Sequence, residues 1–170
     1  MSIKRIVCLL SFTVTFWACK EDELIKTTVL TSSGNEISMD GIWKSSCLDF
    51  TNFRLNENFN FDGENLIITI HQYSAETCEN PDATEIVTIT FQTLETIDVK
   101  LEGKVVTGTQ IKGTQVSSKD GKSSTFKQTF YVDDSSGKNI LYHGVFEDDG
   151  GEVSTDGYPL ELHPFAIVQE

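Results

Sequence analysis

The feature that most constrains the fold is a pair of neighbouring segments with a two-residue period, joined by a tight turn. In residues 53–61, apolar side chains stand at Phe53, Leu55, Phe59 and Phe61, and Arg or Asn fills the even positions. This alternation is typical of a strand with one buried face. Asp62-Gly63 follows, and then LIITIHQY at 66–73. Because glycine tolerates the positive φ of a tight turn, the pattern predicts an antiparallel hairpin.

Short strand-like segments continue along the rest of the chain, and almost no segment has a helical period. Further strands are expected at residues 41–48, 85–94, 97–102, 104–112, 123–132, 139–146 and 165–168. Turns rich in Gly, Asp and Ser separate them. About eight or nine short strands at this spacing indicate an antiparallel β-barrel or sandwich. We therefore expect one all-β domain over residues 40–170.

Residues 1–18 have the composition of an export signal. Lys4 and Arg5 form a short positive region, and 13 mostly apolar residues, 6–18, follow it. This run is too short to span a bilayer but suits the apolar region of a signal peptide. No later stretch approaches the ~20 apolar residues that a membrane helix requires.

Cys19 lies at the end of this signal. The run Phe16-Trp17-Ala18-Cys19 resembles the lipobox of bacterial lipoproteins, which implies that Cys19 is acylated, for example with palmitate, after cleavage of the signal. Cys8 is the alternative acceptor, but only two apolar residues separate it from Arg5. Acyl chains on Cys19 would hold the protein on a membrane. Residues 19–39 are polar and without periodicity, so we expect them to form the lipidated cysteine and a flexible tether.

Cys47 and Cys78 remain after the signal is removed. An isolated cysteine pair in an exported protein favours a disulfide, because the compartment is oxidising and no metal-type spacing surrounds either residue. Two free thiols are the alternative.

A family resemblance adds to this fold prediction. Gly41-Ile42-Trp43 looks like the G-x-W motif of the calycin superfamily, the lipocalins and their bacterial relatives. Together with the segments 43–47, 73–78 and 156–162, the motif resembles small lipocalin-like bacterial lipoproteins. The resemblance implies a lipocalin-like barrel in which Gly41 and Trp43 form a structural plug at one end.

Every second residue of each strand should point into the interior of such a barrel. The candidate lining residues are Phe53, Phe59, Phe61, Ile68, Ile89 and Phe91. A barrel of this size is either filled by its side chains or holds one small apolar ligand. The 11 Phe residues favour a filled interior.

The sequence contains no motif that indicates catalysis. His71, His143 and His163 are far apart in the chain and lack metal-ligand spacing, so we expect them to face solvent and we predict no metal, no cofactor and no catalytic residue. The net charge of −13 repels phosphate backbones, which excludes nucleic acid as a partner.

These features together predict a non-enzymatic lipoprotein of the bacterial cell envelope, which we expect on the outer membrane. It would act by binding. The candidate partners are a small apolar molecule, envelope macromolecules or, if the protein is exposed on the surface, host matrix or complement-regulatory proteins. The alternative is a structural or assembly subunit of the envelope.

Overall fold

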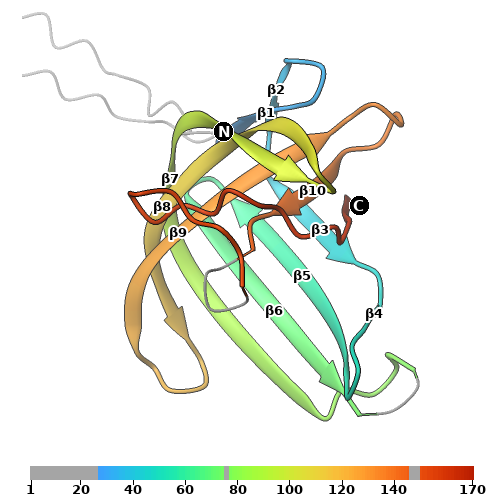
Figure 1. Ribbon diagram of the computed structural model, residues 1–170. Helices are drawn as coiled ribbons and strands as arrows, with labels where there is room; N and C mark the ends of the chain where they lie inside the picture. Colours follow the sequence, from blue (N-terminus) through green and yellow to red (C-terminus); the bar gives the residue numbers. More distant parts are fainter. Residues whose placement is uncertain (1–26, 75–76, 146–149) are drawn as a thin grey trace, which may run out of the picture.

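A computed structural model of the protein describes residues 27–74, 77–145 and 150–170 (Figure 1). The described residues form strands, turns and loops, and none of them is helical. Accordingly, this part of the chain holds no helix with the length and apolar character needed to cross a membrane. The strands are β1 (Thr28–Leu30), β2 (Glu36–Ser38), β3 (Gly41–Ser45), β4 (Leu48–Asp49), β5 (Arg54–Asp62), β6 (Asn65–Tyr73), β7 (Ala83–Leu101), β8 (Lys104–Ser117), β9 (Ser123–Asp133), β10 (Ile140–His143) and β11 (Ile167–Gln169).

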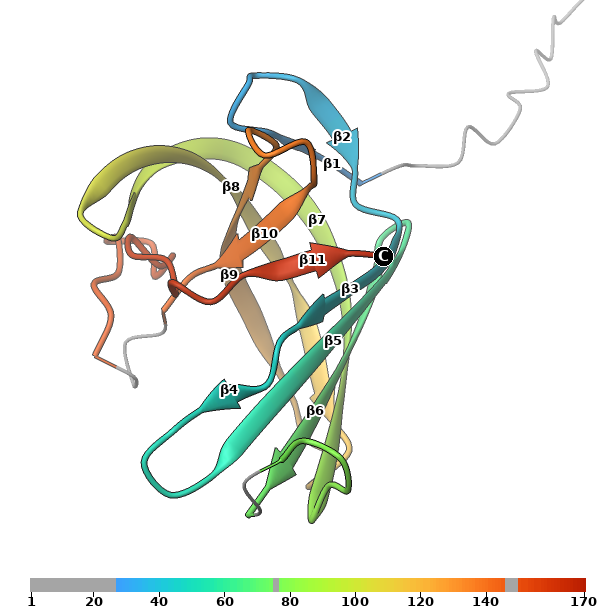
Figure 2. The same ribbon diagram turned by 90° about the vertical axis from the view of Figure 1, so that its right-hand side faces the viewer.

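Eight antiparallel strands close into a barrel in the order β3-β11-β10-β9-β8-β7-β6-β5. Strand β3 closes the ring because it pairs with two neighbours, β5 on one side and β11 on the other, as Figure 2 shows. The short strand β4 pairs only with β5 and lies beside the ring. The predicted single antiparallel β-barrel is therefore confirmed.

The hairpin predicted from the alternating pattern is present as β5 and β6. In its register Phe61 lies opposite Leu66 and Phe59 lies opposite Ile68. Side chains of directly paired residues point to the same face of a sheet. One face of the hairpin is thus apolar and forms part of the barrel interior.

Strand β7 differs from the sequence expectation. Residues 85–94 and 97–102 were expected to form two strands, but the structure has one strand of 19 residues. A bulge between Thr93 and Thr96 interrupts its pairing with β8. An extra residue in a bulge reverses the face to which later side chains point. As a result Ile89 faces the interior core, whereas Val99 packs in a separate cluster outside it.

The main core fills the upper half of the barrel, the end at which β1 and β2 lie in Figure 1. It includes the large, almost fully buried side chains of Trp43, Phe61 and Phe130. Residues 27–39 were expected to be part of a flexible tether, and this expectation is wrong for them. They form the β1–β2 hairpin, whose Val29 and Met39 are buried in the same core.

A second, smaller cluster lies on the outer face of the sheet. Val99, Tyr131 and Leu162 are its buried members. The C-terminal segment around Pro159 is attached to this outer face, since Thr129 Oγ1 donates a hydrogen bond of 3.0 Å to the Pro159 carbonyl. Together the two clusters use both faces of β9.

Candidate functional site

Part of the predicted site falls where the structure gives no description. The signal residues 1–18, Cys8 and the lipidation candidate Cys19 lie outside the described residues. The expectation of a lipid anchor therefore stays a prediction.

The cysteine pair forms the predicted disulfide. Cys47 and Cys78 are bonded to each other, with their Cα atoms 5.9 Å apart. The bond ties the segment between β3 and β4 to the connection between β6 and β7. It thereby cross-links two neighbouring parts of the lower end of the barrel.

Trp43 lies on the inner face of β3 and has no exposed surface. Its indole Nε1 donates a hydrogen bond of 2.8 Å to the Met39 carbonyl. Gly41, at the start of the strand, has a φ of 119°, a value that residues with a side chain rarely adopt. The structure therefore places both residues beside the β1–β2 hairpin, at the upper end of the barrel.

Five of the six candidate lining residues lie at the core. Phe59, Phe61, Ile89 and Phe91 belong to the main core cluster, and Ile68 packs against it. The rings of Phe61 and Phe91 meet edge to face, with centroids 6.0 Å apart. An apolar ligand in this half of the barrel would have to displace these side chains.

Phe53 is the exception, since it does not belong to the main core cluster. It precedes β5 in the turn that follows β4, where its ring stacks on Phe50 with centroids 4.9 Å apart. A surface hollow of about 220 Å³ adjoins this turn. The alternation of β5 begins only at Arg54, because the chain turns at residues 51–53, so parity does not decide which way Phe53 points.

The lower half of the interior contains polar side chains. His143 Nε2 lies 3.5 Å from Glu57 Oε2, and only 12% and 17% of the two side chains is exposed. The His143 ring is also near Phe59 and His163, with centroid distances of 5.7 and 5.0 Å. The interior is thus apolar at the upper end and partly polar and accessible at the lower end.

This pairing corrects the expectation that all three histidines face solvent. His71 lies at the surface, where its Nδ1 forms a hydrogen bond of 3.0 Å with Thr84 Oγ1. A signal for the inward pair was present in the sequence. Glu57 has the same parity as Phe59 and Phe61, and His143 the same parity as the buried Leu141.

The Glu57–His143 pair can accept or donate hydrogen bonds to a polar ligand, and it places a carboxylate in the largely buried part of the barrel. Among the residues that the structure describes, no group of three or more His, Cys, Asp or Glu side chains is arranged to hold a metal ion.

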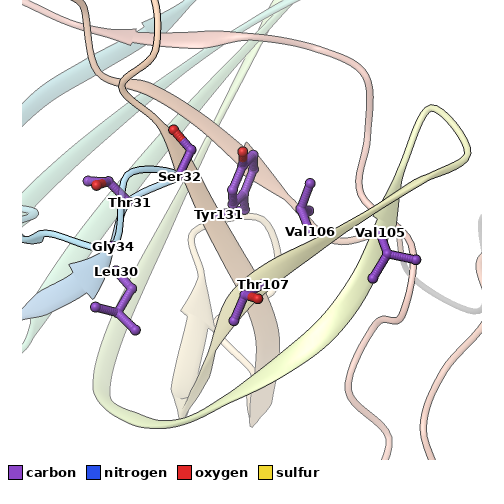
Figure 3. Close-up of a pocket in the computed structure, with 8 residues that line it drawn as sticks. All are labelled: Leu30, Thr31, Ser32, Gly34, Val105, Val106, Thr107 and Tyr131. Carbon is purple, nitrogen blue, oxygen red and sulfur yellow. The ribbon is translucent and has the colours of Figure 1, made fainter.

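A second hollow, of about 410 Å³, lies at the upper end of the barrel. Figure 3 shows the residues that line it: Leu30, Thr31, Ser32, Gly34, Val105, Val106, Thr107 and Tyr131. They come from the β1–β2 turn, the first residues of β8 and the end of β9. We call this hollow the upper groove.

The upper groove exists because β8 and β9 separate there. Their pairing begins only at Thr109 and Phe130. From Lys104 to Gly108, β8 pairs with β7 alone. The other edge of this five-residue stretch faces the groove.

The backbone groups on that edge can be identified. Lys100 of β7 exchanges backbone hydrogen bonds with Leu160 and Leu162, on the side away from β8. Its partner Val105 is therefore in a non-hydrogen-bonded pair, and so is Thr107, two residues on. The N–H and C=O groups of Val105 and Thr107 consequently point away from β7, toward the groove.

The side chains around this edge are both apolar and acidic. Val105 is 70% exposed, far more than any other large apolar residue in the described part of the chain. On the opposite wall Thr31 Oγ1 and Ser32 Oγ donate hydrogen bonds to the two carboxylate oxygens of Asp134, at 2.8 and 2.6 Å. The groove thus combines an exposed valine with an open strand edge, and a carboxylate that Thr31 and Ser32 hold in place lies next to its wall.

Hydrogen bonds and burial shift the pKa values of two acidic groups at this wall. The hydroxyls of Ser32, Ser33 and Thr31 hold the pKa of Asp134 far below its usual range, since they stabilise the charged form. Burial, and then the negative charge of Asp133, raise the pKa of Tyr131 above its usual value. At neutral pH the groove therefore presents a neutral phenol beside ionised carboxylates.

Neither the upper groove nor the Glu57–His143 pair was identified from the sequence. The groove combines segments from three parts of the chain, and its residues form no local motif. The sequence holds one sign of the groove, because Val105 is an apolar residue at the exposed end of a strand.

Comparison with known proteins adds no family to this description. No protein-family model matches the chain, and no curated protein matches it at a significant level.

Proposed function

We propose that the protein is a non-enzymatic, lipid-anchored lipoprotein of the bacterial outer membrane that binds another macromolecule through the upper groove. The lipobox-like run that ends at Cys19 supports the anchor, and the barrel with Trp43 at its upper end is consistent with a lipocalin-like lipoprotein. The partner is a protein of the envelope or, where the barrel is exposed on the cell, of the host.

The observation that carries the binding function is the open edge of β8 beside exposed Val105. Exposed strand edges are sites at which other chains pair, and folded proteins usually cover or shorten them. Here the edge is accessible, and it lies in a hollow rather than on a flat surface.

A small apolar ligand is the weaker alternative for the binding partner. The large side chains of the main core already occupy the upper interior, and Trp43, Phe61 and Ile89 are almost fully buried. A ligand there would have to displace these side chains, and the contacts between them would be lost.

The β1–β2 hairpin determines how far the groove can lie from the membrane. Only the residues between Cys19 and Thr27 can act as a spacer, because Thr27 already belongs to the described fold. Eight residue steps span at most about 29 Å when fully extended. With Cys19 acylated, the groove would thus lie close to the membrane surface.

Site-specific photo-crosslinking in intact cells tests the binding function. A photoreactive phenylalanine at Val105 of the full chain should give one discrete adduct with a second protein. The same residue at Val116, which is 42% exposed on the same strand, is the matched control and should give none. Equal labelling from both positions, or no adduct from Val105, would contradict a partner in the groove.

Native mass spectrometry of the protein extracted from membranes tests the alternative. We expect a triacylated polypeptide without a bound small molecule. A stoichiometric apolar ligand would instead show that the barrel interior is the binding site.

A further inference from the structure

We infer that the upper groove binds its partner by strand addition, and that the segment it accepts is an extended polypeptide with alternating apolar and basic residues. This inference rests on the proposed function and specifies its chemistry. The open edge of β8, the shape of the groove and the charge around it support this mode of binding.

Two residues of the open edge present backbone groups to the groove. Val105 and Thr107 direct two N–H and two C=O groups toward the groove, and no described residue forms a backbone hydrogen bond with them on that side. An incoming extended segment can satisfy these groups in pairs, as a neighbouring strand would. The binding energy would then come mainly from main-chain hydrogen bonds, and side chains would select the sequence.

The walls of the groove select the side chains of the occupant. Leu30, Val105 and Val106 give the groove apolar walls. Because side chains alternate along a strand, an extended segment would direct every second residue at these walls. Those residues should therefore be apolar and of moderate size, such as valine.

The charged side chains near the groove are mostly acidic. Asp133 and Asp134 lie two and three residues after the groove residue Tyr131, and the hydrogen bonds described above keep Asp134 ionised. Asp98 lies directly opposite Thr107 on β7. Lys104 lies at the end of the open edge, and Lys100, opposite Val105, forms a salt bridge of 3.0 Å with Glu152. Lysine or arginine in the remaining positions of the segment would complement this acidic surround.

The same charge argues against a second copy of this chain as the occupant. Edge-to-edge pairing of two barrels would bring together two chains that each have a net charge of −13. Repulsion between like-charged proteins opposes such an association. The negative electrostatic potential that repels a second copy attracts a basic segment.

Peptide probes test the inference directly. The probe is a fluorescein-labelled nine-residue peptide that alternates valine with lysine, and the control peptide has glutamate in place of each lysine. Binding to the full acylated chain in detergent micelles is followed by fluorescence anisotropy. We expect the lysine peptide to bind and the glutamate peptide to bind at least about tenfold more weakly. Equal binding of the two peptides would overturn the basic class of ligand.

Backbone methylation of the lysine peptide tests the mode of binding. Methyl groups on every second amide should weaken binding about tenfold or more when those amides face β8, because two or more hydrogen bonds are lost. Methylation of the amides that face away from β8 should change the affinity of the peptide less than about twofold. Identical effects from both sets would exclude strand addition.

A variant of the protein provides an independent test. Thr107→Pro removes one N–H from the open edge without removing a bond to β7, and Thr107→Val keeps that N–H. We expect the proline variant alone to lose peptide affinity, by about threefold to tenfold. Proton NMR of both variants checks that the barrel is intact.

The outcomes separate this inference from the proposed function. A crosslink from Val105 in cells without sensitivity to methylation or to Thr107→Pro would overturn strand addition and leave the binding function standing. Concentration-dependent dimers of the purified chain that Thr107→Pro abolishes would show that the occupant is a second copy, and would overturn the basic segment.

Discussion

The indole Nε1 of Trp43 donates a hydrogen bond to the Met39 carbonyl, and both residues are completely buried. This contact joins the first barrel strand to the hairpin that precedes it. The barrel and the hairpin are therefore one folded unit, and the upper groove, which both line, has a defined shape.

Replacing Trp43 with Phe should destabilise the protein by about 2–4 kcal/mol, because the Met39 carbonyl loses its partner and a cavity remains. Urea denaturation followed by circular dichroism measures this change. Ile42→Val, on the exposed side of the same strand, is the control and should stay within about 0.5 kcal/mol of the natural protein. A Trp43→Phe variant as stable as the control would argue against the plug.

Val29→Ala tests whether the β1–β2 hairpin is part of the fold. Val29 is 2% exposed in the main core, so its truncation should cost about 1–3 kcal/mol of unfolding free energy. The exposed residue Glu36 of β2 serves as the control, since Glu36→Ala should have almost no effect. Residues 27–39 would have to be regarded as a tether if neither variant changed stability.

Removing the disulfide with Cys47→Ser and Cys78→Ser together should lower the free energy of unfolding by about 3–4 kcal/mol, as the chain-entropy relation gives for a separation of 31 residues. The measurement is denaturation with and without reductant. The natural protein should lose this stability on reduction, and the double variant should not respond. An identical response of both proteins would mean that the bond contributes nothing.

The carboxyl group of Asp134 should remain ionised at pH 3. Its pKa is lowered in the folded state, whereas an unfolded aspartate titrates near pH 3.9. The hydrogen bonds to the β1–β2 turn therefore stabilise the fold fully above about pH 4, and this contribution is lost as the pH falls through the folded pKa. Carbon-detected NMR titration of the side chain measures that pKa.

The matched variant for this titration is Asp134→Asn, which removes the charge and keeps the shape. It should be less stable than the natural protein at neutral pH, and the difference should shrink as the solution is acidified. A folded-state midpoint near 3.9 for Asp134 would show that the three hydroxyl groups do not hold the charged form.

Substituting Cys19 with Ala should abolish incorporation of labelled palmitate and move the protein into the aqueous phase of a detergent partition. Acylation is the only anchor that the lipobox-like sequence predicts. Cys8→Ala is the control and should be labelled like the natural protein. Labelling that depends on Cys8 instead would move the predicted cleavage site.

Most of the barrel could be predicted from the sequence because alternation reports directly on burial. The β5–β6 hairpin is the clearest case, since Phe59 and Phe61 alternate with asparagines and an Asp-Gly turn follows. The bulge in β7 could not be predicted in this way. One extra residue between Thr93 and Thr96 changes the pairing but leaves the β-rich composition of the segment unchanged.

The hairpin of β1 and β2 was missed for a different reason. Each strand has three residues, which is too short to show a period, and the polar residues around them are typical of a linker. Its burial depends on Val29 and Met39, which pack against residues far along the chain. The upper groove was missed as well, because it forms only where this hairpin, β8 and β9 meet.

Closure of the ring has a consequence for the timing of folding. Strand β3, at residues 41–45, has β11 as its second partner in the sheet. Beside this pairing, the Lys44 side chain donates a hydrogen bond to the carboxylate of Glu170, 126 positions further along the chain. Contacts between such distant residues slow folding. A ribosome or a translocation channel that releases the chain from its N-terminus cannot release a closed barrel until β11 has emerged. In an exported chain, as proposed above, the barrel would close only after β11 has crossed the membrane, and both open edges of the sheet would need protection from other proteins until then.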